Sequence, residues 1–225
     1  MLRAATVNYH LSRRSFNGEG TTNYKLMKWV VFLRGVNVGK ANRCRPALIA
    51  KQLTRFGVVN VGAVGTFVVR KNVSESALRA AIAKKLPFKS EIMICPARDV
   101  IKLASKGPFA RQPSGPDITR FVSVLAKPLR RAIGSDSRQT SNLKSASGRI
   151  RRGAHQTFDV PLSLPSDDDW LLKIIAIQGR FILGLYRRQM KAISYLGKIE
   201  KLLGVPATTR NWNTMKKVAE ILDNA

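Results

Sequence analysis

The order of strand and helix patterns between residues 28 and 96 constrains this chain more than any other sequence feature. Runs rich in β-branched residues predict four strands, at 28–34, 59–64, 66–70 and 91–95. Pro46 opens a helix that stops at Gly57, and a second helix, capped by Ser74 or Ser76, ends before Pro87. The apolar face predicted for the first helix is Leu48, Ile49, Leu53 and Phe56. The order β-α-β-β-α-β is that of a ferredoxin-like, split βαβ unit with helices on one face of a sheet.

The remaining residues predict a second, smaller α+β lobe. A helix at 97–106 completes the first lobe, which spans residues 27–110, and the second lobe spans residues 111–222. The strands predicted for the second lobe lie at 118–126, 171–177 and 181–186. Its helices lie at about 193–203 and 214–222, the latter capped by Asn213 or Thr214. We therefore expect an α+β protein with two lobes.

Two segments differ in composition from the rest of the chain. Residues 1–26 show no sustained apolar pattern, and Met27 stands directly before the first strand, so we expect a flexible leader or a misassigned start. Residues 134–159 are rich in Ser, Gly and Arg and lack the large apolar side chains that would offset the entropy of ordering. We therefore expect a flexible insertion that interrupts the second lobe.

Positive charge is concentrated in the first half of the chain. The protein has 40 Lys and Arg against 13 Asp and Glu, which gives a net charge of +27. Residues 27–133 carry 21 basic and four acidic side chains, a net charge of +17, whereas residues 1–26 and 134–159 contribute +3 each. Repulsion of this size opposes compaction unless the charge spreads over a surface or meets a polyanion. The charge therefore favours either a solvated basic face or a partner with phosphate groups, such as nucleic acid.

The sequence disfavours several chemistries. No run reaches about 18 apolar residues, so we expect no membrane span, and two cysteines, Cys44 and Cys95, fit a reduced, cytoplasmic protein. The two histidines, His10 and His155, lie in the leader and the insertion, which disfavours a histidine-dependent catalytic or metal site. We predict no cofactor, no metal and no catalytic residue, and the absence of a recognisable catalytic constellation leaves enzymatic activity undecided.

A loop with two glycines follows the first predicted strand. Its sequence, Gly35-Val36-Asn37-Val38-Gly39-Lys40, has three residues between the glycines and Ala41 after the lysine, which does not fit the P-loop of nucleotide hydrolases. Glycines nevertheless leave backbone N–H groups approachable, and four cations crowd the same loop. We predict an anion site formed by Arg34, Gly35, Asn37, Gly39, Lys40, Arg43 and Arg45. The alternative is a structural turn with solvated cations. The flanking arginines also predict a lowered pKa for Cys44.

The segment Arg210-Asn211-Trp212 is a second candidate binding site. Trp212 could stack on a base or another ring while Arg210 and Asn211 bind its polar edges. In the other interpretation, Trp212 is a hydrophobic staple that fastens the last helix to the core. Both interpretations stay open at the level of sequence.

Two long motifs and one short motif resemble those of a known family. They are residues 32–40 (FLRGVNVGK), residues 204–214 (GVPATTRNWNT) and Gly107-Pro108-Phe109, which is similar to the family's usual Asn-Pro-Phe. The chain thus resembles the bacterial domain-of-unknown-function family DUF1697 over about residues 27–130 and 160–222. This resemblance implies ferredoxin-like α+β subdomains and carries no established activity.

These observations support one leading functional hypothesis and one alternative. The leading hypothesis is a non-enzymatic cytosolic module that binds polyanions, and nucleic acid in particular, through their phosphates. The alternative is a protein or enzyme that binds a small phosphate- or carboxylate-bearing molecule in a pocket between the lobes. The side chains expected around such a pocket are Arg34, Asn37, Lys40 and Asn211. The sequence does not fix the oligomeric state.

Overall fold

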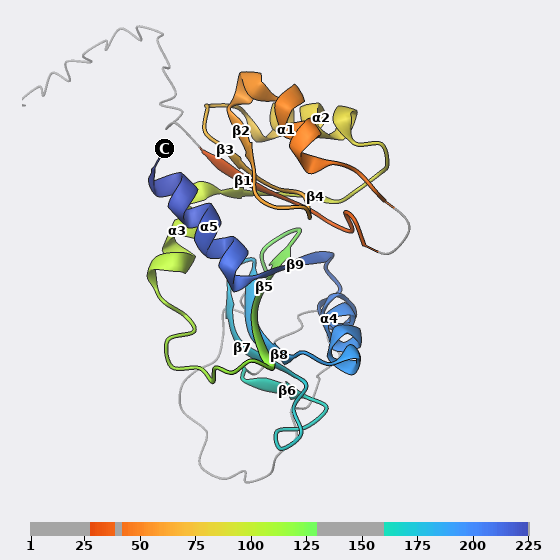
Figure 1. Cartoon of the computed structure of the whole chain (residues 1–225), viewed down its shortest axis with the longest axis vertical. Coiled ribbons are helices and arrows are strands. Elements are labelled where there is room, and N and C mark those ends of the chain that lie inside the picture. Colours follow the sequence, from red (N-terminus) through yellow and green to blue (C-terminus); the bar gives the residue numbers. More distant parts are fainter. Residues whose placement is uncertain (1–27, 39–41, 130–159, 225) are drawn as a thin grey trace, which may run out of the picture.

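The computed structural model describes residues 28–38, 42–129 and 160–224, and within them the chain is an α+β protein with two antiparallel sheets and five α-helices (Figure 1). The first sheet has the order β2-β3-β1-β4 and contains β1 (Trp29–Leu33), β2 (Val58–Asn60), β3 (Thr66–Val69) and β4 (Ile92–Pro96). The predicted α+β class is confirmed. The predicted leader at 1–26 and insertion at 134–159 lie outside the described residues.

The second sheet has five strands, in the order β6-β7-β8-β5-β9. They are β5 (Ile118–Leu125), β6 (Leu162–Leu164), β7 (Leu172–Gln178), β8 (Phe181–Arg187) and β9 (Ala207–Asn211). The expectation of a smaller second lobe is wrong for the sheets, because the first sheet has four strands. The difference arises from β6 and β9, two strands with weak sequence signals, because β6 has only three residues and β9 contains Thr208, Thr209 and Arg210 in place of an apolar run.

Proline, serine and glycine residues mark the ends of the first two helices. Helix α1 (Pro46–Gln52) starts with proline at its first position and passes into a short 3-10 turn (Thr54–Phe56) that ends at Gly57. Gly57 has a φ of 63°, the left-handed conformation that glycine adopts without strain. Helix α2 (Glu75–Lys85) is capped by Ser74, whose Oγ accepts the Ala77 N–H at 3.2 Å. Leu48 is 48% exposed, so its predicted place on the core face of α1 is wrong.

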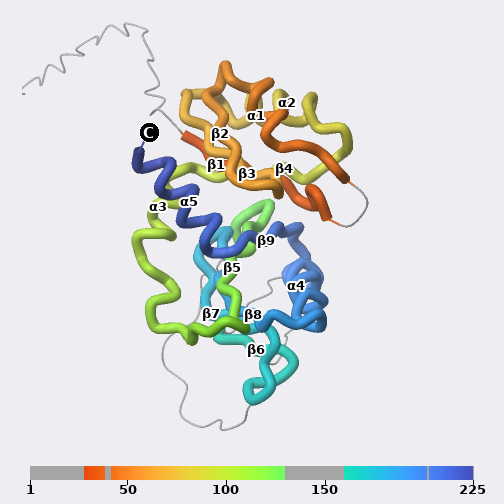
Figure 2. Tube along the Cα trace, viewed as in Figure 1, coloured from red at the N-terminus to blue at the C-terminus, as the bar shows by residue number. Residues whose placement is uncertain are grey.

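The elements stack in layers, as Figure 1 shows. Helices α1 and α2 cover one face of the first sheet, and the second sheet lies against the other face together with α3 (Ala97–Ser105) and α5 (Trp212–Asp223). Helix α4 (Met190–Leu203) covers the far side of the second sheet. Figure 2 traces α5 from the end of β9 back along α3 toward the first sheet. Both lobes therefore contribute to one continuous structure.

Strand β1 shows how tightly the layers pack, because all five of its residues are buried. Trp29, Val31 and Leu33 pack under α1 and α2, whereas Val30 and Phe32 face the second lobe. Val30 and Phe32 belong to the same apolar cluster as residues of α3, β5, β8 and α5, among them Val100, Val122, Leu183 and Met215. The two lobes therefore share a core, and apolar side chains fill the space between the facing sheets.

Candidate functional site

Two segments that are distant in the sequence meet at one end of the first sheet. Leu33 at the end of β1 pairs with Ile92 at the start of β4. Just beyond this pair, the Arg34 N–H donates to Glu91 O at 3.0 Å, and Ser90 Oγ donates to Arg34 O at 2.7 Å. The loop that follows β1 and the connection between α2 and β4 therefore lie side by side (Figure 1).

Five exposed cations lie on these two segments and on the last turn of α2, which leads into the second segment. Arg43 and Arg45 come from the loop after β1, Lys84 and Lys85 from the last turn of α2, and Lys89 from the connection to β4. In the described part of the chain, none of them forms an ion pair with a carboxylate. We call this set of five side chains the basic end. The basic end includes Arg43 and Arg45, two of the residues predicted for the anion site. Its three lysines were not predicted, although Lys84 and Lys85 stand out in the sequence as an adjacent basic pair.

Asn37 fastens the loop after β1. Its Nδ2 donates to Ala63 O at 2.7 Å, and its Oδ1 accepts the Cys44 N–H at 3.0 Å. Gly35 and Asn37 both have positive φ, 69° and 56°. Asn37 therefore supports the turn through both ends of its amide. Gly39 and Lys40, the other predicted members of the anion site in this loop, lie outside the described residues.

Arg34 links the first lobe to the second. Its Nε donates to Glu200 Oε1 at 2.8 Å, and its Nη2 donates to Glu200 Oε2 at 2.5 Å. Glu200 lies on α4, and its Oε1 also accepts the Ala207 N–H of β9 at 3.1 Å. The hydrogen bonding of Arg34 to the Glu200 carboxylate is the main reason that the pKa of Arg34 is raised. The Arg34 guanidinium therefore already binds a carboxylate in a bidentate geometry.

Arg210 is buried between the lobes, with an exposed fraction of 5%. Its Nε donates to Thr66 Oγ1 at 2.7 Å, and its Nη2 donates to Leu33 O at 2.8 Å and Val64 O at 2.9 Å. Its Nη1 donates to Thr208 Oγ1 at 2.8 Å and to Thr209 O at 2.9 Å. Burial lowers the pKa of Arg210 to about 10, so the side chain stays charged at neutral pH. All five N–H donors of the guanidinium are used within the protein.

Asn211 and Trp212 serve the start of α5. Asn211 is the N-cap, and its Oδ1 accepts the Thr214 N–H at 2.8 Å, so the predicted caps Asn213 and Thr214 are wrong. Trp212 is half-buried, and its ring meets Phe109 edge-on with the ring centres 5.1 Å apart. Trp212 therefore packs the last helix against the core, but it does so as the first residue of α5 and not as a hydrophobic staple, which would precede the cap.

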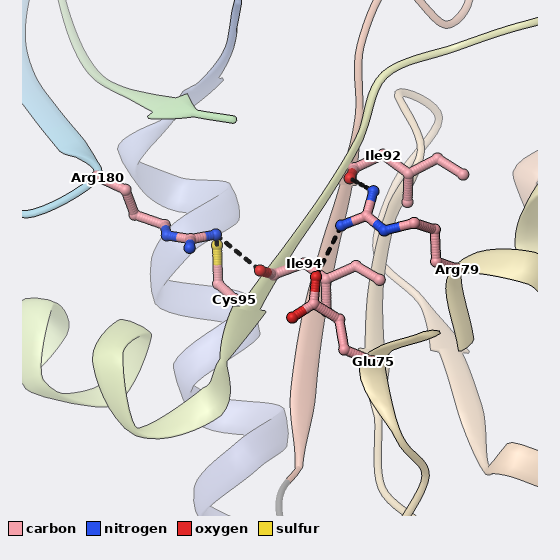
Figure 3. Close-up of polar contacts among 6 residues, drawn as sticks. All are labelled: Glu75, Arg79, Ile92, Ile94, Cys95 and Arg180. Atoms are coloured by element: carbon pink, nitrogen blue, oxygen red, sulfur yellow. Dashed lines mark hydrogen bonds and ion pairs between the residues drawn. The ribbon is translucent and has the colours of Figure 1, made fainter. Parts of the chain in front are cut away.

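Two further arginines cover the free edge of β4 (Figure 3). Arg79 of α2 donates to Ile92 O at 2.5 Å and to Glu75 Oε1 at 2.8 Å. Arg180, in the turn between β7 and β8, donates to Ile94 O at 2.7 Å. Unpaired carbonyl groups at the edge of a sheet can pair with a strand of another molecule. The hydrogen bonds from Arg79 and Arg180 occupy two of these carbonyls on β4. Arg180 is thus the third arginine that links the lobes through hydrogen bonds, after Arg34 and Arg210.

The two cysteine thiols are kept protonated. Burial raises the pKa of Cys95 to about 11 and outweighs the opposite effect of Arg180. Burial also raises the pKa of Cys44, so the predicted lowering by its neighbouring arginines is wrong. Desolvation of the thiolate exceeds the attraction of arginine side chains that remain in water.

The arrangement of the polar side chains bears on metal and small-ligand chemistry. In the described ranges, no group of three or more His, Cys, Asp or Glu side chains is placed to bind a metal ion. None of the helices there is long and apolar enough to cross a membrane. Of the side chains expected around a small-ligand pocket, Arg34, Asn37 and Asn211 each form an intramolecular hydrogen bond, and Lys40 lies outside the described residues.

The fold defines an α+β protein whose two sheets share a core and whose first sheet ends in exposed cations. The chain belongs to a protein family of unknown function, DUF1697, whose sequence model matches residues 26–153. The chain is also similar to the solved structure of the conserved bacterial protein SP0830 from Streptococcus pneumoniae, with 16% sequence identity and a TM-score of 0.46. That similarity covers 88% of this chain and 99% of the pneumococcal chain. Comparison with curated protein sequences gives no match.

Proposed function

We propose that this chain is a non-enzymatic module that binds polyanions, and nucleic acid in particular, through their phosphate groups. The observation that carries the proposal is the basic end, where two segments present five exposed cations without a carboxylate partner in the described part of the chain. Exposed Lys and Arg side chains bind phosphates by releasing condensed counterions, and they do so without reading a base sequence.

The surroundings of the basic end support this choice over a small-ligand site. Glu200, the carboxylate that reaches this end from the second lobe, is paired with Arg34 and leaves the five cations to solvent. Trp212 packs against Phe109, and the donors of Arg210 are used internally, so neither supplies a stacking or hydrogen-bonding surface for a base. Contacts to phosphates are the chemistry that this arrangement favours.

A paired substitution tests the site. Lys84→Gln/Lys85→Gln removes two cations of the basic end, and Lys216→Gln/Lys217→Gln removes a matched pair of exposed lysines from α5. Both variants lower the net charge equally, so a general charge effect is the same in each. Fluorescence anisotropy with a labelled DNA duplex and a labelled RNA should show weaker binding for the first variant only. Its plot of log affinity against log salt on duplex DNA should be less steep by about 0.9 for each phosphate that the variant no longer neutralises.

Two results would count against the proposed function. One is the absence of any DNA or RNA binding by the unmodified protein at low salt. The other is an equal loss of affinity in both lysine-pair variants, because binding would then follow total charge and not the basic end. Thermal unfolding of each variant provides the control for folding, since cations in the last turn of a helix contribute about 0.3–1 kcal/mol.

The proposal includes two finer points about the protein. We assign the first lobe to the ferredoxin-like, split βαβ class, supported by the element order β1-α1-β2-β3-α2-β4 and the sheet order β2-β3-β1-β4. We also place the protein in the cytoplasm, supported by free thiols at Cys44 and Cys95, which are usual in a reducing compartment.

A further inference from the structure

The Glu200 carboxylate occupies a cradle built from both lobes. Arg34, just after β1, supplies two N–H donors, and the Ala207 N–H of β9 supplies a third at 3.1 Å. A planar guanidinium beside a backbone N–H is the donor arrangement that proteins use for carboxylates and phosphates alike. The occupant in this structure is a side chain of the same protein.

This cradle adjoins the basic end. The Arg34 carbonyl accepts a hydrogen bond from Ser90 Oγ, and Ser90 directly follows Lys89. The side chains of the pair remain open to solvent, with exposed fractions of 45% for Arg34 and 28% for Glu200. An external anion can therefore reach the guanidinium, and Glu200 can turn into water without crossing the core.

We propose that the cradle formed by Arg34 and the Ala207 N–H is a phosphate site of the polyanion surface, which Glu200 occupies until a phosphate displaces it. The inference rests on the proposed function and adds a regulatory contact to it. The carboxylate mimics the charge and the two-oxygen geometry of a phosphate, and it competes from within the same molecule. Polyanion binding is thereby weakened, and a bound polyanion breaks a link between α4 and the first lobe.

Glu200→Gln tests this competition. Glutamine keeps an oxygen for the Ala207 N–H but loses the negative charge that attracts Arg34. We expect its affinity for duplex DNA at low salt to rise about tenfold, the scale of one charge-assisted hydrogen bond. The slope of log affinity against log salt should steepen by about 0.9. The matched control is Glu220→Gln on α5, an exposed carboxylate whose substitution changes the net charge equally.

A second substitution links the gain to the cradle. Arg34→Ala alone should weaken DNA binding by less than the tenfold gain of Glu200→Gln, because in the unmodified protein the phosphate contact of Arg34 is offset by the loss of its contact with Glu200. Arg34→Ala combined with Glu200→Gln should abolish the gain. Equal affinities for Glu200→Gln and Glu220→Gln, with salt-dependent binding by the unmodified protein, would overturn this inference and leave the proposed function standing. No binding by the unmodified protein or by any variant would overturn both.

Discussion

Replacement of Arg210 by lysine distinguishes a structural role of this residue from a role in ligand binding. Lysine retains the positive charge but offers three N–H donors in place of the five that Arg210 uses. Leu33 O would keep a second donor, Thr208 Oγ1 at 3.2 Å, whereas Val64 O and Thr66 Oγ1 would depend on the shorter side chain. At least two charge-assisted hydrogen bonds are therefore removed while the cost of burying the charge remains.

The expected loss of stability follows from those two bonds. A hydrogen bond to a charged group contributes about 1.5–3 kcal/mol, so Arg210→Lys should lower the free energy of unfolding by about 4 kcal/mol. That is a large part of the roughly 5–15 kcal/mol that stabilises a typical domain. The matched control is Arg188→Lys, an exposed arginine whose Nε donates to Thr119 Oγ1 at 3.2 Å, for which we expect a change below about 0.5 kcal/mol.

Urea unfolding followed by tryptophan fluorescence measures both variants, because Trp29 lies in the core of the first lobe and Trp212 packs against the core that the lobes share. The shared core predicts one cooperative transition, with a midpoint lower by about 2 M for Arg210→Lys at a typical urea dependence of about 2 kcal/mol per molar. An unchanged midpoint together with abolished polyanion binding would refute the structural reasoning. That outcome would return Arg210 to the ligand-binding role that its sequence motif first suggested.

Three further substitutions or reactions test the packing, the capping and the thiols. Gly184→Ala should destabilise by several kcal/mol, because its Cβ would lie 2.5 Å from Lys173 O. Gly197→Ala on α4, whose Cβ would meet nothing beyond the adjacent helix backbone within 4 Å, should be neutral or stabilising by up to about 1 kcal/mol. Thermal unfolding compares the two variants, and similar melting temperatures would contradict the packing. Asn211→Ala should cost about 1 kcal/mol in urea unfolding through loss of the α5 cap and leave polyanion affinity unchanged, and a loss of affinity alone would contradict the capping role. The pKa of Cys95 is about 11 in the folded chain and about 9 in the unfolded chain, so the free energy of unfolding should fall as pH rises between these values. Replacement of Cys95 by valine should remove this contribution to the pH dependence of stability.

Local sequence patterns were sufficient to predict most of the secondary structure. The apolar runs of β1, β3, β4, β5, β7 and β8 and the cap at Ser74 are signals contained in a few adjacent residues. Strand β9 escaped prediction because its buried positions include Thr208 and Arg210, polar residues whose hydrogen bonds to the first lobe, such as those to Leu33 O, exist only in the folded chain. The cap of α5 was misplaced because two other capping residues, Asn213 and Thr214, follow Asn211 closely.

The candidate site was predicted less completely, for a physical reason. The positive charge of the first lobe is a property of composition and could be read directly from the sequence. The pairing of Arg34 with Glu200 joins residues 166 positions apart, and no local pattern indicates it. Arginine is a residue type that often binds ligands, and only the fold shows that the hydrogen-bond partners of Arg210 lie within the protein. Sequence thus identified the charge but not which cations remain exposed.

The most direct measurement is a nuclear magnetic resonance titration of the ¹⁵N-labelled protein with a short DNA duplex at low ionic strength. The proposed function predicts that amide shifts concentrate at the basic end, at Arg43, Arg45, Lys84, Lys85 and Lys89, and fade as salt is added. The amides of Lys216 and Lys217 on α5 should remain unperturbed. Shifts centred on α5, or a spectrum unchanged by the duplex, would contradict the account.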